Sequence, residues 1–351
     1  MKERVTALFL ALIMCYTLCA CGNSSAVSDD KTISFTDSCG RVVDIPAQID
    51  HIAVSGTMAQ VVVFALAPDK LVGIADAWSD IARRYIPDKY IDLPILGQLY
   101  GGKGDLNPET LLNSGAQVVV DVGEAKDGIA ADLDALQAQT GLPFVHIDAT
   151  LSSLDDTYTM LGQLLGMTDE ASVLSKYCRH VYDRAVSIAD RAEKVDLLYL
   201  LGDQGCNVIA RNSYHSEVID LLSNNLAVVD TPSAKGTGNE TDLEQILLWD
   251  PDYILFSPDS ICAQAANDPA WQQVSAIKNG HCCQVPEGPY NWMGFPPSAQ
   301  RLLGMIWMTY VLYPDACGYK LYDEVAQYFR LFYHTELTHD QFDKLIANSL
   351  L

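Results

Sequence analysis

The sequence predicts an α/β protein of two lobes, each built around a parallel sheet, with one long helix joining them. Short apolar runs alternate with helical patterns from Asp50 onward, and the same alternation restarts near Asp196. Each half holds one copy of a similar segment, "LNPETLLNSGAQVVVDVG" and "DLEQILLWDPDYILFSP". Roughly 320 residues remain after an N-terminal leader, which exceeds the usual size of a single core.

The first half predicts strands with helices between them. Expected strands are residues 51–56, 70–76, 116–123 and 143–149, and expected helices are residues 57–67, 107–115 and 132–141. Pro108 near the start and Gly115 at the end delimit the second of these helices.

The second half predicts strands at residues 196–203, 251–258 and 282–286, with helices at 215–225, 240–250 and 298–313. Between the halves, residues 168–195 carry one apolar stripe at helical spacing, with no glycine or proline inside. A helix of about 25 residues would reach roughly 38 Å, enough to bridge two lobes. An ordinary surface helix of one domain is the alternative.

The chain begins with an export leader. Lys2 and Arg4 precede an apolar run, Ala7–Leu18, that is too short to anchor in a bilayer. Leu18-Cys19-Ala20-Cys21 resembles the bacterial lipobox, which implies cleavage before Cys21 and a lipid on its sulfur. The predicted organisation is a signal peptide (1–20), a lipidated cysteine and tether (21–32), a first lobe (33–154), a connecting helical segment (155–195) and a second lobe with C-terminal helices (196–351).

Composition limits the function. The formal net charge of −23 argues against a nucleic-acid partner, because a phosphate backbone attracts the opposite sign. Seven cysteines remain after Cys21, an odd number without a CxxC pair, so no zinc site or cofactor is predicted. Nucleophile and P-loop motifs are missing, and Cys206 with His215 is the one pairing an enzyme could use.

Four segments together resemble the lipoprotein substrate-binding components of ABC importers for iron complexes, cobalamin and related chelates. They are "FTDSCGRVVDIPAQIDHIAV", with His51 where arginine is usual, "LGQLYGGKGDLNPETLL", "LEQILLWDPDYIL" and "EGPYNWMGFPPSAQRLL". The resemblance implies two Rossmann-like lobes, an extracytoplasmic monomer held to the membrane by its lipid alone, and no enzymatic activity. It also implies delivery to a permease dimer with a cytoplasmic ATPase, docked by Glu109 and Glu244. A ferric siderophore is the favoured ligand, and corrinoid, haem, molybdate and tungstate stay open.

The ligand is expected between the lobes, where loops follow the carboxyl ends of strands. The loop at residues 287–301 offers Tyr290 and Trp292 as flat faces for an organic chelate, unless Trp292 and Phe295 fold inward as a plug. Arg301 would bind an anionic group or form an internal ion pair with an acid. Further candidates at strand ends are Met58, Trp78, Tyr100, Lys103, Lys126, Arg211, Tyr214 and His215, with His215 also the lone weak candidate for a metal ligand.

Overall fold

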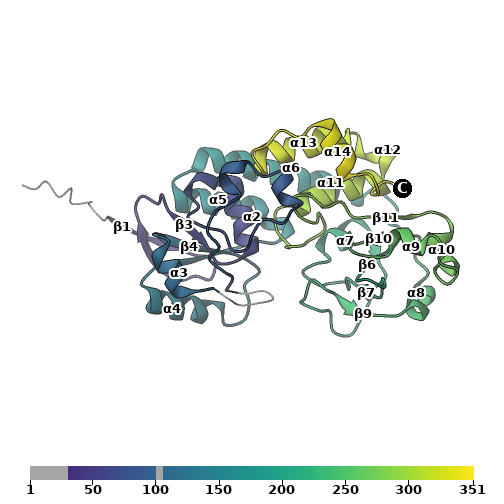
Figure 1. Cartoon of the computed structure of the whole chain (residues 1–351), viewed down its shortest axis with the longest axis horizontal. Coiled ribbons are helices and arrows are strands. Elements are labelled where there is room, and N and C mark those ends of the chain that lie inside the picture. The colour runs from purple at the N-terminus through teal and green to yellow at the C-terminus, as the bar shows by residue number, and fades with distance from the viewer. Residues whose placement is uncertain (1–30, 100–105) are drawn as a thin grey trace, which may run out of the picture.

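The first lobe is built on a three-stranded parallel sheet. A computed structural model describes residues 31–99 and 106–351 (Figure 1). The sheet order is β3-β4-β5, comprising β3 (Ile52–Val54), β4 (Val118–Gly123) and β5 (Phe144–Asp148). Every residue of β4 is buried, because apolar side chains face helices on both sides of a parallel sheet. The helices of this lobe are α2 (Thr57–Leu66), α3 (Pro108–Asn113), α4 (Ile129–Thr140) and α5 (Leu154–Leu165), and an antiparallel hairpin of β1 (Thr32–Thr36) and β2 (Val42–Pro46) precedes them.

The second lobe holds a mixed sheet of order β11-β10-β6-β7-β9, with β8 also paired to β6. Its parallel part is β6 (Asp196–Leu201), β8 (Asn224–Asn225), β10 (Tyr253–Phe256) and β11 (Cys282–Gln284). The centre of this sheet is parallel, as predicted, and the short strands β7 (Asn207–Val208) and β9 (Asn239–Glu240) add an antiparallel edge. The helices of this lobe are α7 (Glu217–Leu222), α8 (Leu243–Trp249), α9 (Cys262–Ala265) and α10 (Ser275–Lys278).

Two predicted elements differ from the structure. Residues 70–76 form no strand; Leu71 and Ile74 are buried but make only isolated bridges, to Ile52 and Ile95. The helix expected at residues 215–225 is limited to α7, because the chain turns extended at Ser223 and enters β8. In both places the apolar spacing correctly indicated that side chains are buried. It did not indicate where the backbone would form its hydrogen bonds.

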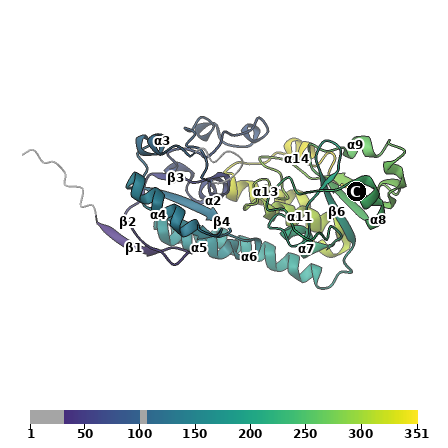
Figure 2. The same cartoon turned by 90° about the horizontal axis from the view of Figure 1, so that it is seen from below.

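The long helix is α6 (Thr168–Ala189), 22 residues, or roughly 33 Å. Figure 2 shows α5 and α6 running along one side of the molecule, past both lobes. Helix α6 packs on α5 and α2 of the first lobe and on α7 and α11 (Arg301–Leu312) beyond it. That α6 alone joins the lobes stays a prediction, because the C-terminal helices also contact the first lobe.

The C-terminal helices cross back over the first lobe. After α11 come α12 (Pro314–Cys317), α13 (Leu321–Phe332) and α14 (His339–Leu345), seen in yellow at the top of Figure 1. The ring of Phe332 lies edge-on to that of Tyr158 in α5, with centroids 5.7 Å apart. Just after α13, the His334 Nε2 lies 3.1 Å from the carbonyl oxygen of Phe64 in α2. Helix α13 and the residue His334 just after it therefore complete the core of the first lobe.

No helix within residues 31–99 and 106–351 is long and apolar enough to cross a bilayer.

Candidate functional site

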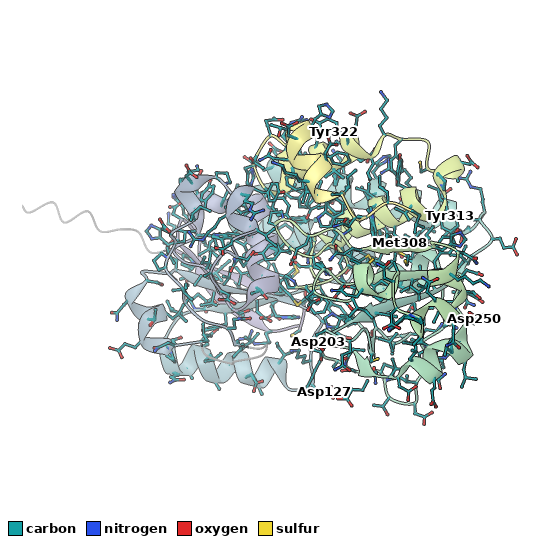
Figure 3. All side chains as sticks on the ribbon, turned by 45° about the vertical axis from the view of Figure 1, so that its right-hand side comes forward. Asp127, Asp203, Asp250, Met308, Tyr313 and Tyr322 are labelled. Atoms are coloured by element: carbon teal, nitrogen blue, oxygen red, sulfur yellow. The ribbon has the colours of Figure 1, made fainter. Side chains whose placement is uncertain are left out.

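The candidate site lies where loops from the two lobes meet. In the first lobe these loops follow β3, β4 and β5 at their carboxyl ends; in the second they are residues 209–216 and 286–300. Figure 3 labels Asp127, beyond β4, and Asp203, beyond β6, toward the lower edge of the molecule where the lobes adjoin. Carboxyl ends of parallel strands gather at one edge of a sheet, which is why these loops converge.

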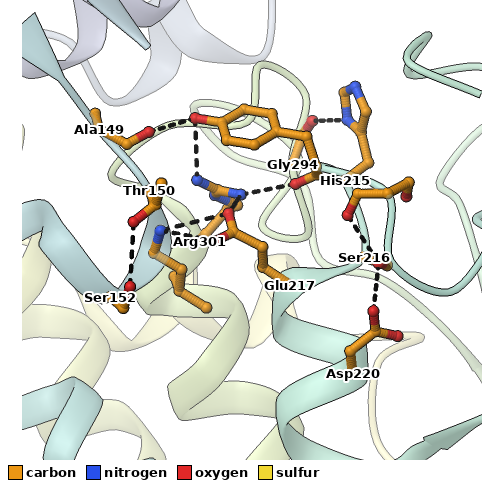
Figure 4. Close-up of polar contacts among 12 residues, drawn as sticks. Ala149, Thr150, Ser152, His215, Ser216, Glu217, Asp220, Gly294 and Arg301 are labelled. Atoms are coloured by element: carbon orange, nitrogen blue, oxygen red, sulfur yellow. Dashed lines mark hydrogen bonds and ion pairs between the residues drawn. The ribbon is translucent and has the colours of Figure 1, made fainter. Parts of the chain in front are cut away.

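Five residues from both lobes form a polar cluster that we call the interlobe cluster: Ala149, Leu151, Tyr214, Glu217 and Arg301 (Figure 4). The Tyr214 hydroxyl donates to the carbonyl oxygen of Ala149 at 2.5 Å. The Glu217 carboxylate accepts the backbone N–H of Leu151, with its two oxygens 3.2 and 3.4 Å from that nitrogen. Two residues of the second lobe thus bond directly to the backbone of the first.

Arg301 is the centre of this cluster. It begins α11, is 1% exposed and pairs with Glu217. Its Nη1 also donates to the carbonyl oxygen of Tyr214 at 3.0 Å, and its guanidinium carbon lies 4.8 Å from the centroid of the Tyr214 ring. The internal ion pair is therefore the arrangement found, and the prediction that Arg301 presents its charge to a ligand is wrong for this structure.

His215 lies beside this cluster and is nearly buried. Its Nδ1 is 3.2 Å from the carbonyl oxygen of Gly294, and its ring faces Phe295 with centroids 5.7 Å apart. Burial lowers the pKa of His215, and the nearby Arg301 charge lowers it further. A Cβ on Gly236 would lie 2.5 Å from Phe295 Cε1 and 3.2 Å from His215 Cε1, so glycine permits this close packing. Among residues 31–99 and 106–351, no group of three or more His, Cys, Asp or Glu is placed to hold a metal.

The first lobe also contributes residues near the candidate site. Met58, half-buried in the first turn of α2, places its Cε within 2.7 Å of the position that a Cβ on Gly123 would take. Burial raises the pKa of Tyr214 to about 12, and the carboxylates of Glu217 and Glu124 add to the rise. The rings of Tyr214, His215 and Phe295 pack next to one another, with centroids 6.3 Å apart for the first pair and 5.7 Å for the second.

The tryptophans predicted to contact the ligand are in the core. Trp292 is 0% exposed, and its Nε1 donates to the carbonyl oxygen of Gly288 at 3.0 Å. Trp78 is 3% exposed, and its Nε1 donates to the carbonyl oxygen of Tyr90 at 2.8 Å. The prediction that these two rings face the cleft is wrong. Helix α11 approaches the 287–301 loop closely, since a Cβ on Gly304 would meet the Trp292 carbonyl oxygen at 2.4 Å.

Tyr290 is half-buried. Its hydroxyl accepts from the Gln60 Nε2 at 3.2 Å, and its ring lies 6.1 Å from that of Trp78. Gln60 is itself 1% exposed and accepts the backbone N–H groups of Ala75 and Asp76. A polar chain therefore links the aromatic loop of the second lobe to the first, which sequence spacing did not reveal.

The remaining predicted residues divide into exposed and undescribed positions. Lys126 and Arg211 are exposed on their loops. Tyr100, Lys103 and Cys21 lie outside the described residues. The Cys206 thiol bonds to the carbonyl oxygen of Gln204 and His215 to that of Gly294, so the nucleophile pairing considered from sequence has no support.

Glu109 and Glu244 occupy matching positions. Each is exposed and is the second residue of a short helix, α3 or α8, whose capping side chain accepts backbone N–H groups. Asn107 caps α3 and Asp242 caps α8. Each helix leads into a buried strand, β4 or β10, and the two helices lie on the same lower side of their lobes in Figure 1.

Sequence reasoning missed a buried polar group in the sheet of the first lobe. Ser55, after β3, donates to the carboxylate of Asp121 in β4, whose other oxygen lies 2.6 Å from the Nδ1 of His146 in β5. Asp121 and His146 are paired in the sheet register, and both are buried. Polar letters inside apolar strand patterns, at positions 121 and 146, are the signal that could have found it.

Comparisons with known proteins agree with this geometry. The model of a family described as periplasmic binding protein matches residues 54–288. A comparison with curated protein sequences finds no significant match.

Among solved structures, an ABC transporter solute-binding protein from Sulfurospirillum deleyianum is similar, with 22% identity and a TM-score of 0.81 over 90% of this chain and 99% of that one. The molybdate-bound periplasmic binding protein MolA of Haemophilus influenzae is 18% identical, with a TM-score of 0.68 over 87% and 99%. The catecholate-siderophore binding protein VctP of Vibrio cholerae is 16% identical, with a TM-score of 0.57 over 79% and 98%.

Proposed function

This chain belongs to the periplasmic binding protein family, and from that premise we propose that it is the extracytoplasmic solute-binding component of an ABC importer. The observation that carries the proposal is the interlobe cluster, in which Tyr214 and Glu217 of one lobe bond to the backbone of the other. A solute held between the lobes would contact residues from both. Binding and release would then be coupled to the relative position of the lobes.

The ligand proposed is a metal chelate, with a ferric siderophore favoured. Met58, Tyr214, His215 and Phe295 offer apolar faces with few polar atoms, which suit an organic ligand. The likeness to a catecholate-siderophore binder supports this class. Corrinoid and haem would fit the same kind of surface.

An oxyanion is the second candidate. The start of α2 beside Met58 has no capping side chain, and MolA binds molybdate on a similar fold. The ion pair between Arg301 and Glu217 weighs against an oxyanion, because a buried cation that is already paired is not available to bind the ligand.

The ligand class is tested by a thermal-shift panel on the purified protein. It should hold a ferric catecholate, a ferric hydroxamate, haem, cobalamin, molybdate and tungstate. A ligand at 100 times its dissociation constant adds about 2.7 kcal/mol to the folded state, which raises the melting midpoint. A shift with molybdate alone would replace the chelate by the oxyanion, and no shift with any compound would remove both.

Delivery is proposed to depend on Glu109 and Glu244, which would meet arginines of the permease. Exposed charges of this kind set orientation and encounter rate more than affinity. Replacing both by alanine should abolish uptake in cells while ligand affinity stays unchanged. Glu170 and Glu193, also exposed, serve as a matched control that removes the same charge elsewhere. Normal uptake by the first variant would contradict the docking role.

The chain is further proposed to be held at the membrane by a lipid on Cys21. A lipid chain buries its methylene groups in the bilayer, so its loss frees the protein. Cys21→Ser should move the protein from the membrane fraction to the soluble fraction, with its fold intact by circular dichroism. Retention of that variant in the membrane fraction would contradict the anchor.

A further inference from the structure

We propose that Cys262 and Cys282 form a disulfide bond that ties helix α9 to the edge strand β11 of the second lobe. Cys262 is the first residue of α9, and Cys282 is the first residue of β11. The two elements contact each other, and both side chains pack, half-buried, against the same hydrophobic cluster around Ile254 and Trp271. Each thiol also shifts the pKa of the other, as expected for two neighbouring side chains.

The other described cysteines are placed differently. Adjacent residues of a strand face opposite sides of a sheet, and Cys283 accordingly points into the first core cluster, away from Cys282. The Cys206 thiol bonds to the carbonyl oxygen of Gln204, and that of Cys317 to the carbonyl oxygens of Pro314 and Tyr319. Cys262 and Cys282, by contrast, pack against the same cluster from two contacting elements, and each thiol shifts the pKa of the other.

The local environment assigns different roles to the two sulfurs. The interaction between the two thiols lowers the pKa of Cys282, whereas the same interaction and burial raise the pKa of Cys262. Cys282 is therefore the thiolate that attacks first. It displaces one thiolate from a small-molecule disulfide and forms a mixed disulfide. Cys262 then loses its proton and attacks the Cys282 sulfur, releasing the second thiolate. Two protein thiols are oxidised, and one external disulfide is reduced to two thiols.

The bond would fix a weak part of the lobe. Strand β11 has three residues and lies at the end of the sheet, paired on one side only, to β10. Beyond it the chain enters the 286–300 loop that meets the other lobe. Closing the segment between Cys262 and Cys282 restricts the unfolded chain, so oxidation should raise the melting midpoint by on the order of 5 °C.

The test uses the full chain, reduced, then treated with oxidised glutathione, with remaining thiols blocked by an alkylating reagent. Trypsin cuts after Lys278, between the two cysteines, so the bond appears as a linked pair of peptides that reduction separates. Cys262→Ser and Cys282→Ser should each abolish the linked pair and the rise in midpoint.

Cys283→Ser and Cys206→Ser should retain the linked pair and serve as matched controls. Loss of the pair in Cys283→Ser, a link through Cys206, or no link in a chain that remains folded by circular dichroism would overturn the proposal. None of these readouts involves a transported solute, so the outcome is independent of the proposed function.

Discussion

Removing the negative charge of Glu217 should destabilise the protein substantially. The Arg301 side chain is 1% exposed, whereas the Glu217 side chain is 26% exposed. Glu217→Gln preserves the size of the side chain and an oxygen for the Leu151 N–H, but leaves a buried cation without its counter-charge. Breaking a buried pair in this way costs about 3–5 kcal/mol, and water reaching Glu217 places the loss near the lower end, at about 3 kcal/mol. The assay is urea unfolding followed by circular dichroism.

Two further variants make this reasoning refutable. Arg301→Met combined with Glu217→Gln removes the orphaned charge, so the double variant should be more stable than Glu217→Gln alone. Glu336→Gln breaks the exposed pair with Arg330 and should leave the unfolding midpoint unchanged within error. If Glu217→Gln behaved like Glu336→Gln, or if the double variant were no better than the single one, the cluster would not hold the buried charge as described.

Trp292→Ala should lower the free energy of unfolding by about 3–5 kcal/mol, because it empties a fully buried site, while the folded fraction keeps its ligand affinity. Loss of ligand affinity without loss of stability would instead indicate that Trp292 contacts the ligand. For His215, the lowered pKa means that the unfolded chain binds a proton before the folded chain does. Stability should therefore fall as pH drops below the ordinary histidine pKa of about 6.5 and flatten below the folded pKa. His215→Gln should show a shallower fall in urea unfolding between about pH 7 and about pH 5; an unchanged profile would contradict this assignment.

Local signals predicted the repeated segments well. Pro108 and Gly115 as helix limits, a glutamate in the first turn of each helix, and a run such as Val118–Gly123 are all readable from nearby residues, and the structure forms both helix–strand units. The strand predicted at residues 70–76 does not form. Its alternating pattern reflects the burial of Leu71 and Ile74, and no neighbouring strand offers a continuous ladder of hydrogen bonds.

The site was less predictable because its contacts join distant parts of the chain. A loop tryptophan becomes a core residue only when another element covers it, and Trp292 is covered by α11 through the close approach of Gly304. Arg301 finds Glu217 across 84 positions, which no spacing rule indicates. Exposure of Glu109 and Glu244 was predictable, since each depends only on its own short helix.

The return of α13 over the first lobe bears on the order in which the chain can acquire its structure during synthesis. Phe64 and Tyr158 belong to the first half, yet their partners His334 and Phe332 are made last. A nascent chain ending near residue 195 would hold its first sheet but leave an apolar face of α2 and α5 uncovered. N-terminal domains usually fold as independent units while the ribosome continues. Here the first lobe has to wait for α13 and His334, so an apolar face stays exposed to chaperones until that part of the chain has been made.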